Sequence, residues 1–176
     1  LIPAVIIILA IAGTGIVFAT LYRRAEKDRA YVRTGLGGQK VVVDGGALFL
    51  PVFHSISWVN LKTLRLDVGR SQADALITKD RMRVDIGVDF YVRVKPDAQS
   101  IALAAQTLGD RTNNADQLRE LVEAKFVDAL RSVAATMTLA DLQEQRAEFV
   151  RAVQTTVASD LEHNGLELES ASLIKL

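Results

Sequence analysis

The residues able to carry out chemistry are few in this chain of 176 residues. Cysteine is absent, which excludes a disulfide framework, a thiolate metal site and a cysteine nucleophile. Neither of the two histidines, His54 and His163, has a second histidine or an acidic residue at ligand spacing that a fold would obviously bring together with it. We therefore interpret each of them as a lone surface or core residue and predict no metal site and no cofactor.

Three aspartates of one segment, Asp80, Asp85 and Asp89, are the next candidates, because two carboxylates can act as an acid and a base. Asp85 and Asp89 share one face of a predicted strand, where four residues span roughly 13 Å. That separation is too large for an acid and base pair, so ion pairing with neighbours or with another subunit is the default interpretation. The sequence indicates a protein that is not an enzyme.

A glycine-rich segment, Gly35-Leu36-Gly37-Gly38, has the composition of a phosphate-binding loop. It lacks the Lys-Ser/Thr that follows in such loops, and it precedes a strand instead of a helix. A tight turn is therefore the better interpretation. Positive and negative side chains are equal in number, 21 of each, so the basic excess of nucleic-acid-binding proteins is also missing.

The first 22 residues predict a membrane-spanning helix. They carry no charge, and 17 of them are apolar. As a helix the segment would be roughly 33 Å long, enough for a hydrocarbon core of about 30 Å. A buried core helix would be shorter and amphipathic, and a signal peptide would have a shorter apolar core and a cleavage site.

A basic juxtamembrane segment, residues 23–29, follows the predicted span and contains Arg23, Arg24, Lys27 and Arg29. Basic residues near the end of a span stay on the cytoplasmic side, so we expect the rest of the chain to be cytoplasmic. The alternative is that Arg23 and Arg24 only reach back to the lipid interface.

The remaining residues predict an α+β domain with two halves of opposite charge. Residues 23–95 contain 14 basic and 8 acidic side chains, and residues 96–176 contain 7 and 13. We expect the basic half to face anionic lipid. Within residues 30–95, apolar residues occupy every second position from Met82 to Val94, which predicts one long strand with one buried face. Thr78-Lys79-Asp80 predicts a hairpin between this strand and residues 74–77.

Residues 96–176 predict mostly helix. A short helix over 101–108 ends before Gly109, and Asn114 is the predicted cap of a second helix. Thr138 and Asp141 have the spacing of a capping box that opens a third helix, which would end near Gly165. Strand alternation returns from Leu166.

Two surfaces are candidates for function. Residues 48–53 are apolar and interrupted by a proline, which disfavours a central strand. They predict a loop that inserts into the bilayer, and the alternative is a loop folded onto the β half's own core. The open side of the 82–94 strand carries charges of both signs and predicts a subunit contact, or else ion pairs within its own sheet. The loop residues are Leu48, Phe49, Leu50, Val52 and Phe53, and the contact residues are Arg83, Asp85, Asp89 and Arg93.

Six blocks of sequence, in this order, resemble the bacterial flotillin-like inner-membrane proteins of the SPFH (stomatin/prohibitin/flotillin/HflKC, Band 7) superfamily. The resemblance extends over essentially the whole chain. The blocks are YRR at 22–24, VRTGLGGQKVV at 32–42, ITKDRMRVD at 77–85, AAQTLG at 104–109, KFVDALR at 125–131 and NGLELES at 164–170.

The resemblance implies a single span followed by a two-part SPFH domain, with a β-rich membrane-proximal part (30–95) and a helical distal part (96–176). It also implies a homo-oligomer, a large ring or cage, that organises a membrane microdomain and corrals client membrane proteins. The runner-up is a regulator of a membrane protease, as in the HflK/HflC branch. The chain starts at Leu1 and stops at Leu176 within an alternating stretch, so we expect further sequence at both ends, including a coiled coil.

Overall fold

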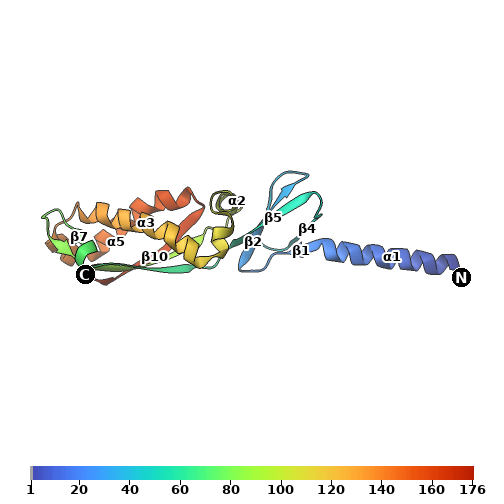
Figure 1. Ribbon diagram of the computed structural model, residues 1–176, viewed down its shortest axis with the longest axis horizontal. Coiled ribbons are helices and arrows are strands. Elements are labelled where there is room, and N and C mark those ends of the chain that lie inside the picture. The colour runs from blue at the N-terminus through green and yellow to red at the C-terminus, as the bar shows by residue number, and fades with distance from the viewer. Residues whose placement is uncertain (1) are drawn as a thin grey trace.

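A computed structural model describes residues 2–176 and confirms the apolar N-terminal helix. Helix α1, Ile2–Leu21, extends away from the rest of the molecule (Figure 1). Its residues from Pro3 to Leu21 are long and apolar enough to cross a membrane, and none of them is buried against protein. A candidate span is therefore followed by a mixed β and α domain, as predicted.

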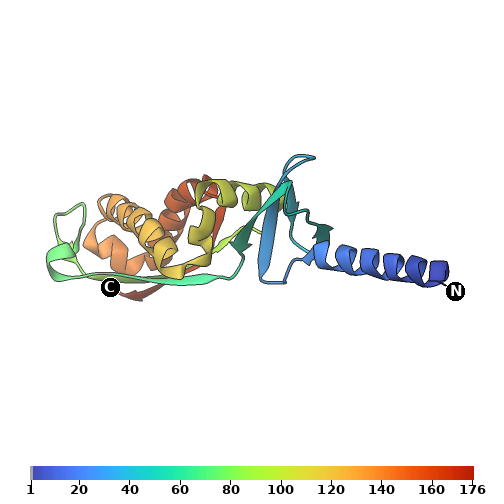
Figure 2. The same cartoon turned by 45° about the vertical axis from the view of Figure 1, so that its right-hand side comes forward.

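Two small sheets lie next to α1. Strand β1 (Tyr22–Arg24) pairs with β4 (Gly46–Leu48) in an antiparallel ribbon. Strands β3 (Lys40–Val42), β2 (Arg29–Gly35) and β5 (His54–Asn60) form an antiparallel sheet in the order β3-β2-β5. Figure 2 shows this sheet and the ribbon between α1 and the helices of the domain.

The β3-β2-β5 sheet is covered on both faces. On one face Tyr31 is fully buried, its ring lies 5.2 Å from that of Trp58, and its hydroxyl donates to the Arg23 carbonyl at 3.0 Å. On the other face Val32 and Val59 join the main hydrophobic core. This double coverage ties the ribbon that follows α1 to the rest of the domain.

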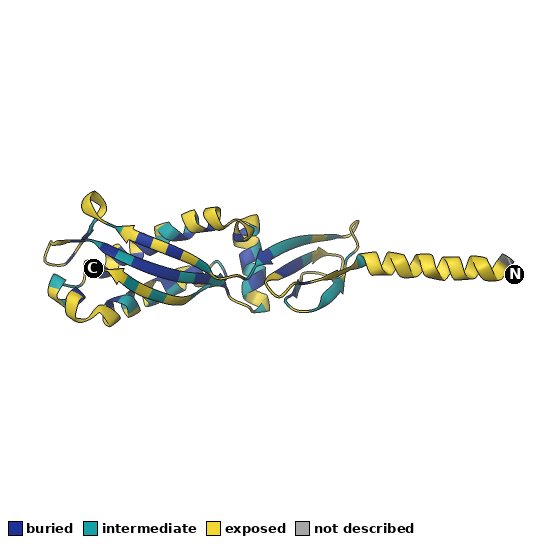
Figure 3. Ribbon diagram, turned by 90° about the horizontal axis from the view of Figure 1, so that it is seen from below, coloured by how far each residue is buried: buried dark blue, intermediate teal, exposed yellow. Residues whose placement is uncertain are grey.

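A second antiparallel sheet has the order β10-β9-β6 and carries the main core. It consists of β6 (Leu64–Arg70), β9 (Ile86–Val94) and β10 (Leu166–Lys175). Helices α3 (Ala115–Ala134) and α5 (Arg146–Glu162) cover one face. Figure 3 shows the other face, on which edge strand β6 alternates between buried and exposed residues, whereas most residues of edge strand β10 are intermediate or exposed. The rings of Phe90 and Phe126 stack at 4.0 Å between the sheet and α3.

The predicted hairpin is present, but the single strand from Met82 to Val94 is wrong. Strand β7 (Leu76–Ile77) pairs with β8 (Arg83–Val84) around residues 78–82, and 3₁₀ helix η1 (Gln72–Asp74) precedes them. The chain leaves strand geometry at Asp85, whose carboxylate accepts a hydrogen bond from the Gln72 amide at 3.0 Å. Strand β9 then begins at Ile86 in a different sheet.

The helix signals are largely confirmed. Helix α2 runs over Ala98–Thr107, followed by 3₁₀ helix η2 (Gly109–Asn113), and Asn114 caps α3 as predicted. Thr138 and Asp141 form the predicted capping box of α4 (Leu139–Glu144). The third helix is not continuous, because Gln145 has a non-helical ψ of 47° and separates α4 from α5.

The predicted division at residues 95 and 96 remains a prediction. The sheet that contains β9 and β10 crosses it, since β9 lies in the first half and β10 in the second. Strands β6 and β9 share one core with the helices of the second half.

The cap of α2 leads to a prediction on acid stability. The amide and hydroxyl of Ser100 each donate to the Asp97 carboxylate at 2.8 Å, and these bonds, the amide first, hold the pKa of Asp97 below its ordinary value. The stabilisation is complete above about pH 4, the ordinary Asp value, and is lost as pH falls through the lower folded pKa. Asp97→Ala should cost about 1 kcal/mol at neutral pH in thermal melts.

The matched control is Asp97→Asn, because an asparagine caps equally well but does not titrate. It should melt like the wild type at neutral pH and lose less stability between about pH 4 and about pH 2. If its melting temperature follows the wild-type pH profile, the cap carboxylate does not contribute to acid stability.

Candidate membrane-contact site

The predicted inserting loop begins directly beside the end of the apolar helix. Tyr22, the first residue after α1, pairs with Leu48 at the end of β4. The Phe49 amide then donates to the carbonyl of Leu21, the last residue of α1, at 2.8 Å. A lipid surface at the end of α1 would therefore also be within reach of residues 48–53.

Most apolar side chains of this loop are exposed. Val52 is 85% and Phe53 56% exposed, Leu48 and Leu50 are also exposed, and Phe49 is partly buried. The loop is a turn in which Leu50 accepts backbone hydrogen bonds from Phe53 and His54 at 3.0 and 2.9 Å. The apolar surface of residues 50–53 thus faces away from the core of the protein.

A second loop lies against the first, a contact that the sequence did not predict. The glycine-rich segment is a tight turn between β2 and β3, and Leu36 within it is 72% exposed. The His54 ring joins both loops, since Nδ1 accepts from the Leu50 amide at 3.2 Å and Nε2 lies 3.0 Å from the Leu36 carbonyl. A lone leucine among glycines was the only sequence signal for this contact.

The predicted basic segment does not stay together in the structure. Arg23 and Arg24 lie in β1, immediately after α1. Lys27 lies in the following turn, and Arg29 pairs with Asn60. That pair is at the end of the β3-β2-β5 sheet opposite to the Gly35–His54 pair, which adjoins the apolar loop. Only the first two arginines are therefore close to the end of α1.

The predicted subunit-contact residues lie in two places. Arg83 and Asp85 belong to the β7–β8 hairpin and its exit, whereas Asp89 and Arg93 lie in β9. Asp89 is buried and accepts from the Arg65 guanidinium at 2.6 Å, which raises the pKa of Arg65.

Arg93 donates to the Glu167 carboxylate at 2.6 Å, and this bond raises the pKa of Arg93. Both β9 residues thus form ion pairs within their own sheet, which is the alternative stated for this strand.

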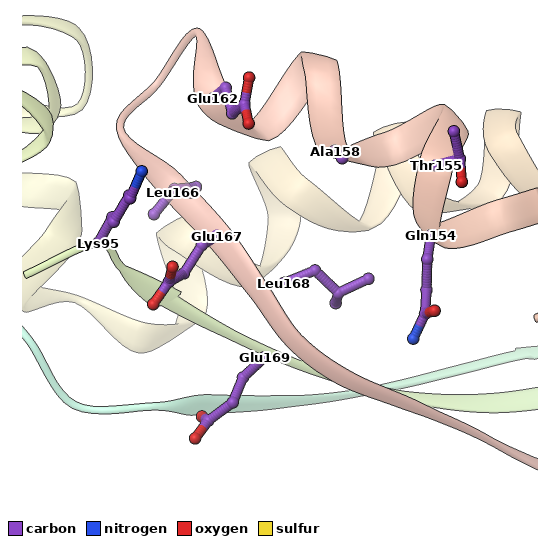
Figure 4. A pocket seen from close by; sticks show the side chains of 9 residues that line it. All are labelled: Lys95, Gln154, Thr155, Ala158, Glu162, Leu166, Glu167, Leu168 and Glu169. Carbon is purple, nitrogen blue, oxygen red and sulfur yellow. The ribbon is translucent and has the colours of Figure 1, made fainter. Parts of the chain in front are cut away.

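A cavity of about 440 Å³ lies between α5 and β10. Figure 4 shows Gln154 reaching from α5 towards β10, while Glu167 and Glu169 extend from the side of the strand away from the helix. Glu167 is held by Arg93, and Glu169 accepts from the Thr63 hydroxyl at 2.8 Å. Within residues 2–176 no group of three or more histidine or acidic residues is arranged to hold a metal ion.

Comparison with known proteins decides the family. The profile of the SPFH domain / Band 7 family matches residues 23–176, which is the whole chain after α1 and Tyr22. The chain belongs to the SPFH domain / Band 7 family. The apolar helix therefore precedes an SPFH domain directly.

Flotillin-like relatives support this assignment. The chain is 60% identical over 170 residues to the "Flotillin family inner membrane protein YqiK" of Escherichia coli, covering 97% of the chain and 31% of that protein. It is 31% identical to the "Flotillin family inner membrane protein sll1021" of Synechocystis, over 99% of the chain and 27% of the relative. The "Flotillin-like protein FloT" of Bacillus subtilis is 30% identical, with 89% of the chain and 32% of the relative covered. The chain spans about a third of the length of these relatives.

The exposed loop of the SPFH domain gives a prediction on lipid binding. Changing Val52 and Phe53 to Ser in a chain of residues 23–176 should weaken its sedimentation with anionic vesicles about ten-fold or more, because the lost apolar area contributes roughly 25 cal/mol per Å². The melting temperature should not change, since both side chains are exposed. A fall in melting temperature with unchanged binding per folded molecule would instead show that the loop packs onto its own domain.

Proposed function

We propose that this flotillin-family protein is a membrane-anchored scaffold that organises a patch of bilayer and corrals client membrane proteins. The observation that carries this proposal is the continuity between the candidate span and the SPFH domain. The first strand after α1 is already part of that domain, and the Leu21 carbonyl accepts a hydrogen bond from Phe49. An SPFH domain attached so closely is held at the membrane surface, where it can contact neighbouring lipids and membrane proteins.

The proposed location is the bacterial inner membrane, with the SPFH domain on the cytoplasmic side. Two relatives are named inner membrane proteins, and Arg23 and Arg24 follow α1 directly. Basic residues at this position favour retention on the cytoplasmic side. We propose that the basic membrane-proximal half binds anionic lipid. We also propose that the apolar residues of the 48–53 loop insert into the same bilayer.

Lateral assembly into a large ring or cage is the proposed mode of action. The β10-β9-β6 sheet has two edge strands on opposite sides, so a repeated head-to-tail contact between copies is possible. The proposed charged contact residues are Arg83, Asp85, Asp89 and Arg93. Because the charges of Asp89 and Arg93 are already matched by ion pairs within their own sheet, Arg83 and Asp85 are the members of this set that we expect to face a neighbouring copy.

A regulator of a membrane protease is the second candidate function. The resemblance to the SPFH superfamily also covers its HflK/HflC branch, in which the SPFH domain lies on the opposite side of the membrane. Membrane topology therefore separates the two proposals. We propose no catalytic activity in either case, and the names of the relatives include no reaction.

Topology is tested with a reporter fused after Leu176. Alkaline phosphatase, which is active only after export, should be inactive at this position, whereas a cytoplasmic fluorescent reporter should be bright. The expected difference follows from Arg23 and Arg24 at the end of the span. High phosphatase activity would contradict the cytoplasmic orientation and favour the protease-regulator alternative. A fusion to a variant with both arginines changed to Glu provides the control for the charge effect.

A further inference from the structure

Two basic residues that the sequence analysis did not single out lie opposite one another near the end of α1. Arg33 of β2 and Lys40 of β3 are direct partners in the antiparallel register. Directly opposed residues of an antiparallel pair share a face of the sheet, with Cβ atoms about 5 Å apart, and like charges there destabilise the pair. An anion bound between or above the two side chains would remove this repulsion.

Neither residue finds that anion within the protein. Six ion pairs occur in residues 2–176, and none of them includes Arg33 or Lys40. The only described hydrogen bond of the Arg33 side chain runs from Nη1 to the Leu48 carbonyl at 2.6 Å, and its Nε is buried without a partner. Buried donors without a partner are uncommon in folded proteins, and the guanidinium has further N–H groups, besides the one bonded to Leu48, that are free to bind an anion.

The position of the pair relates it to the membrane. The Leu48 carbonyl that accepts from Arg33 belongs to the residue paired with Tyr22, the first residue beyond α1. Lipid phosphates lie just outside the hydrocarbon core, at the level where a spanning helix ends. The Arg33 guanidinium is therefore at phosphate height if α1 spans the bilayer.

The surroundings hold the two residues in place. The apolar loop that begins at Leu48 and the turn that contains Leu36 are joined by the His54 ring. The Phe53 carbonyl lies so close to Gly35 that no Cβ would fit there. Arg33 and Lys40 thus lie on strands whose connecting turn is fixed against the apolar loop by these contacts.

We propose that Arg33 and Lys40 form a phosphate-binding site that takes the headgroup of an anionic phospholipid. A guanidinium can bind two phosphate oxygens at once, and the lysine ammonium adds a point charge beside it. The acyl chains of the same lipid would lie beside α1 and the exposed residues Val52 and Phe53. This inference rests on the proposed membrane function and adds to it a defined headgroup site, as distinct from a diffuse attraction to negative charge.

Lipid retention tests the site in the whole chain. The protein is reconstituted in nanodiscs of equal phosphatidylcholine and phosphatidylglycerol, transferred to detergent and washed at rising salt, and the phosphatidylglycerol kept per chain is counted by mass spectrometry. Arg33→Gln with Lys40→Gln should weaken retention about ten- to one-hundred-fold, the range for losing hydrogen bonds to a charged group. The control, Arg111→Gln with Arg146→Gln, removes two exposed charges far along the chain and should retain lipid like the wild type.

A second arm separates a lipid phosphate from a free one. Inorganic phosphate in excess is added to chains in nanodiscs of phosphatidylcholine alone, and melting temperatures are compared with chloride at equal ionic strength. A rise for the wild type but not for the double variant would support the phosphate site with a soluble anion as occupant. Retention of phosphatidylglycerol without this rise would support the lipid headgroup.

Two results would overturn the proposal. One is a double variant that keeps as much phosphatidylglycerol as the wild type and gains the same stability from phosphate. The other concerns Lys40→Gln alone, which should fold normally because Lys40 is exposed. If this variant melts like the wild type and retains as much phosphatidylglycerol, the proposal is wrong. Either result leaves the scaffold proposal intact if the variant still inserts, whereas a chain that does not insert at all contradicts the scaffold proposal itself.

Discussion

Replacing Gly165 by alanine is expected to lower the free energy of unfolding by about 3–5 kcal/mol and the melting temperature by about 10 °C. Gly165 has a φ of +70°, a region that L-residues with a Cβ rarely adopt. An added Cβ would lie 2.1 Å from the Ser100 carbonyl oxygen of α2 and 3.0 Å from the Ala104 nitrogen. Backbone strain and steric overlap therefore act together at this position.

The size of the effect reflects where Gly165 lies. It connects α5 to β10, its carbonyl accepts from the Lys95 amide at 3.1 Å, and α2 packs directly over it. The measurement is a thermal melt of the whole chain in detergent, followed by circular dichroism.

Gly69→Ala is the matched control, because Gly69 lies in β6 with open space around its Cβ position and an ordinary φ. We expect it to stay within about 1 kcal/mol of the wild type. If Gly165→Ala has the same melting temperature as Gly69→Ala, α2 does not approach Gly165 as closely as described.

Phe126→Ala should destabilise the domain to a similar extent. Phe126 is completely buried in α3, and its ring stacks on that of Phe90 with centroids 4.0 Å apart. Truncation of a buried phenylalanine typically costs about 3–5 kcal/mol, from lost apolar burial and the cavity that remains. We expect a fall in melting temperature of about 10 °C in the same assay.

Phe53→Ala is the control for the phenylalanine truncation, since Phe53 is more than half exposed at the apolar loop. Its melting temperature should match the wild type. Equal melting of Phe126→Ala and the wild type would mean that α3 does not pack on the β10-β9-β6 sheet through this pair.

The features that sequence predicted well depend on residues close together in the chain. The apolar span, the Asn114 cap and the Thr138–Asp141 box are set by a few neighbouring residues. The hairpin around residues 78–82 is equally local. Each of these local patterns favours one structure, so the residue types and their spacing were enough to predict it.

The features that sequence missed depend on pairs distant in the chain. Asp89 had the position of an open-face residue in β9, but it is buried and forms an ion pair with Arg65 of the neighbouring strand β6. The break at Asp85 arises because the strands on its two sides pair with different partners. Both the burial of Asp89 and the break at Asp85 depend on how the strands pair. The alternation of residues within one segment does not predict which strand it pairs with or in which register.

The candidate site shows the same limit. The apolar loop could be identified from its own composition, whereas Leu36 joins it through the His54 side chain and through its own amide, which donates to the Phe53 carbonyl. Arg33 and Lys40 are seven positions apart and meet only because the glycine turn folds β2 against β3. The basic residues near the end of the span therefore include Arg33 and Lys40 as well as Arg23 and Arg24, which follow the span directly in sequence.

Electron cryomicroscopy of inner-membrane vesicles that contain the complete natural protein tests whether this SPFH protein is a membrane-anchored scaffold. We expect closed rings or cages on the vesicle surface, each enclosing a patch of membrane, with the SPFH domains against the lipid. Single copies scattered on the membrane, with no lateral contact at physiological expression, would contradict the scaffold proposal.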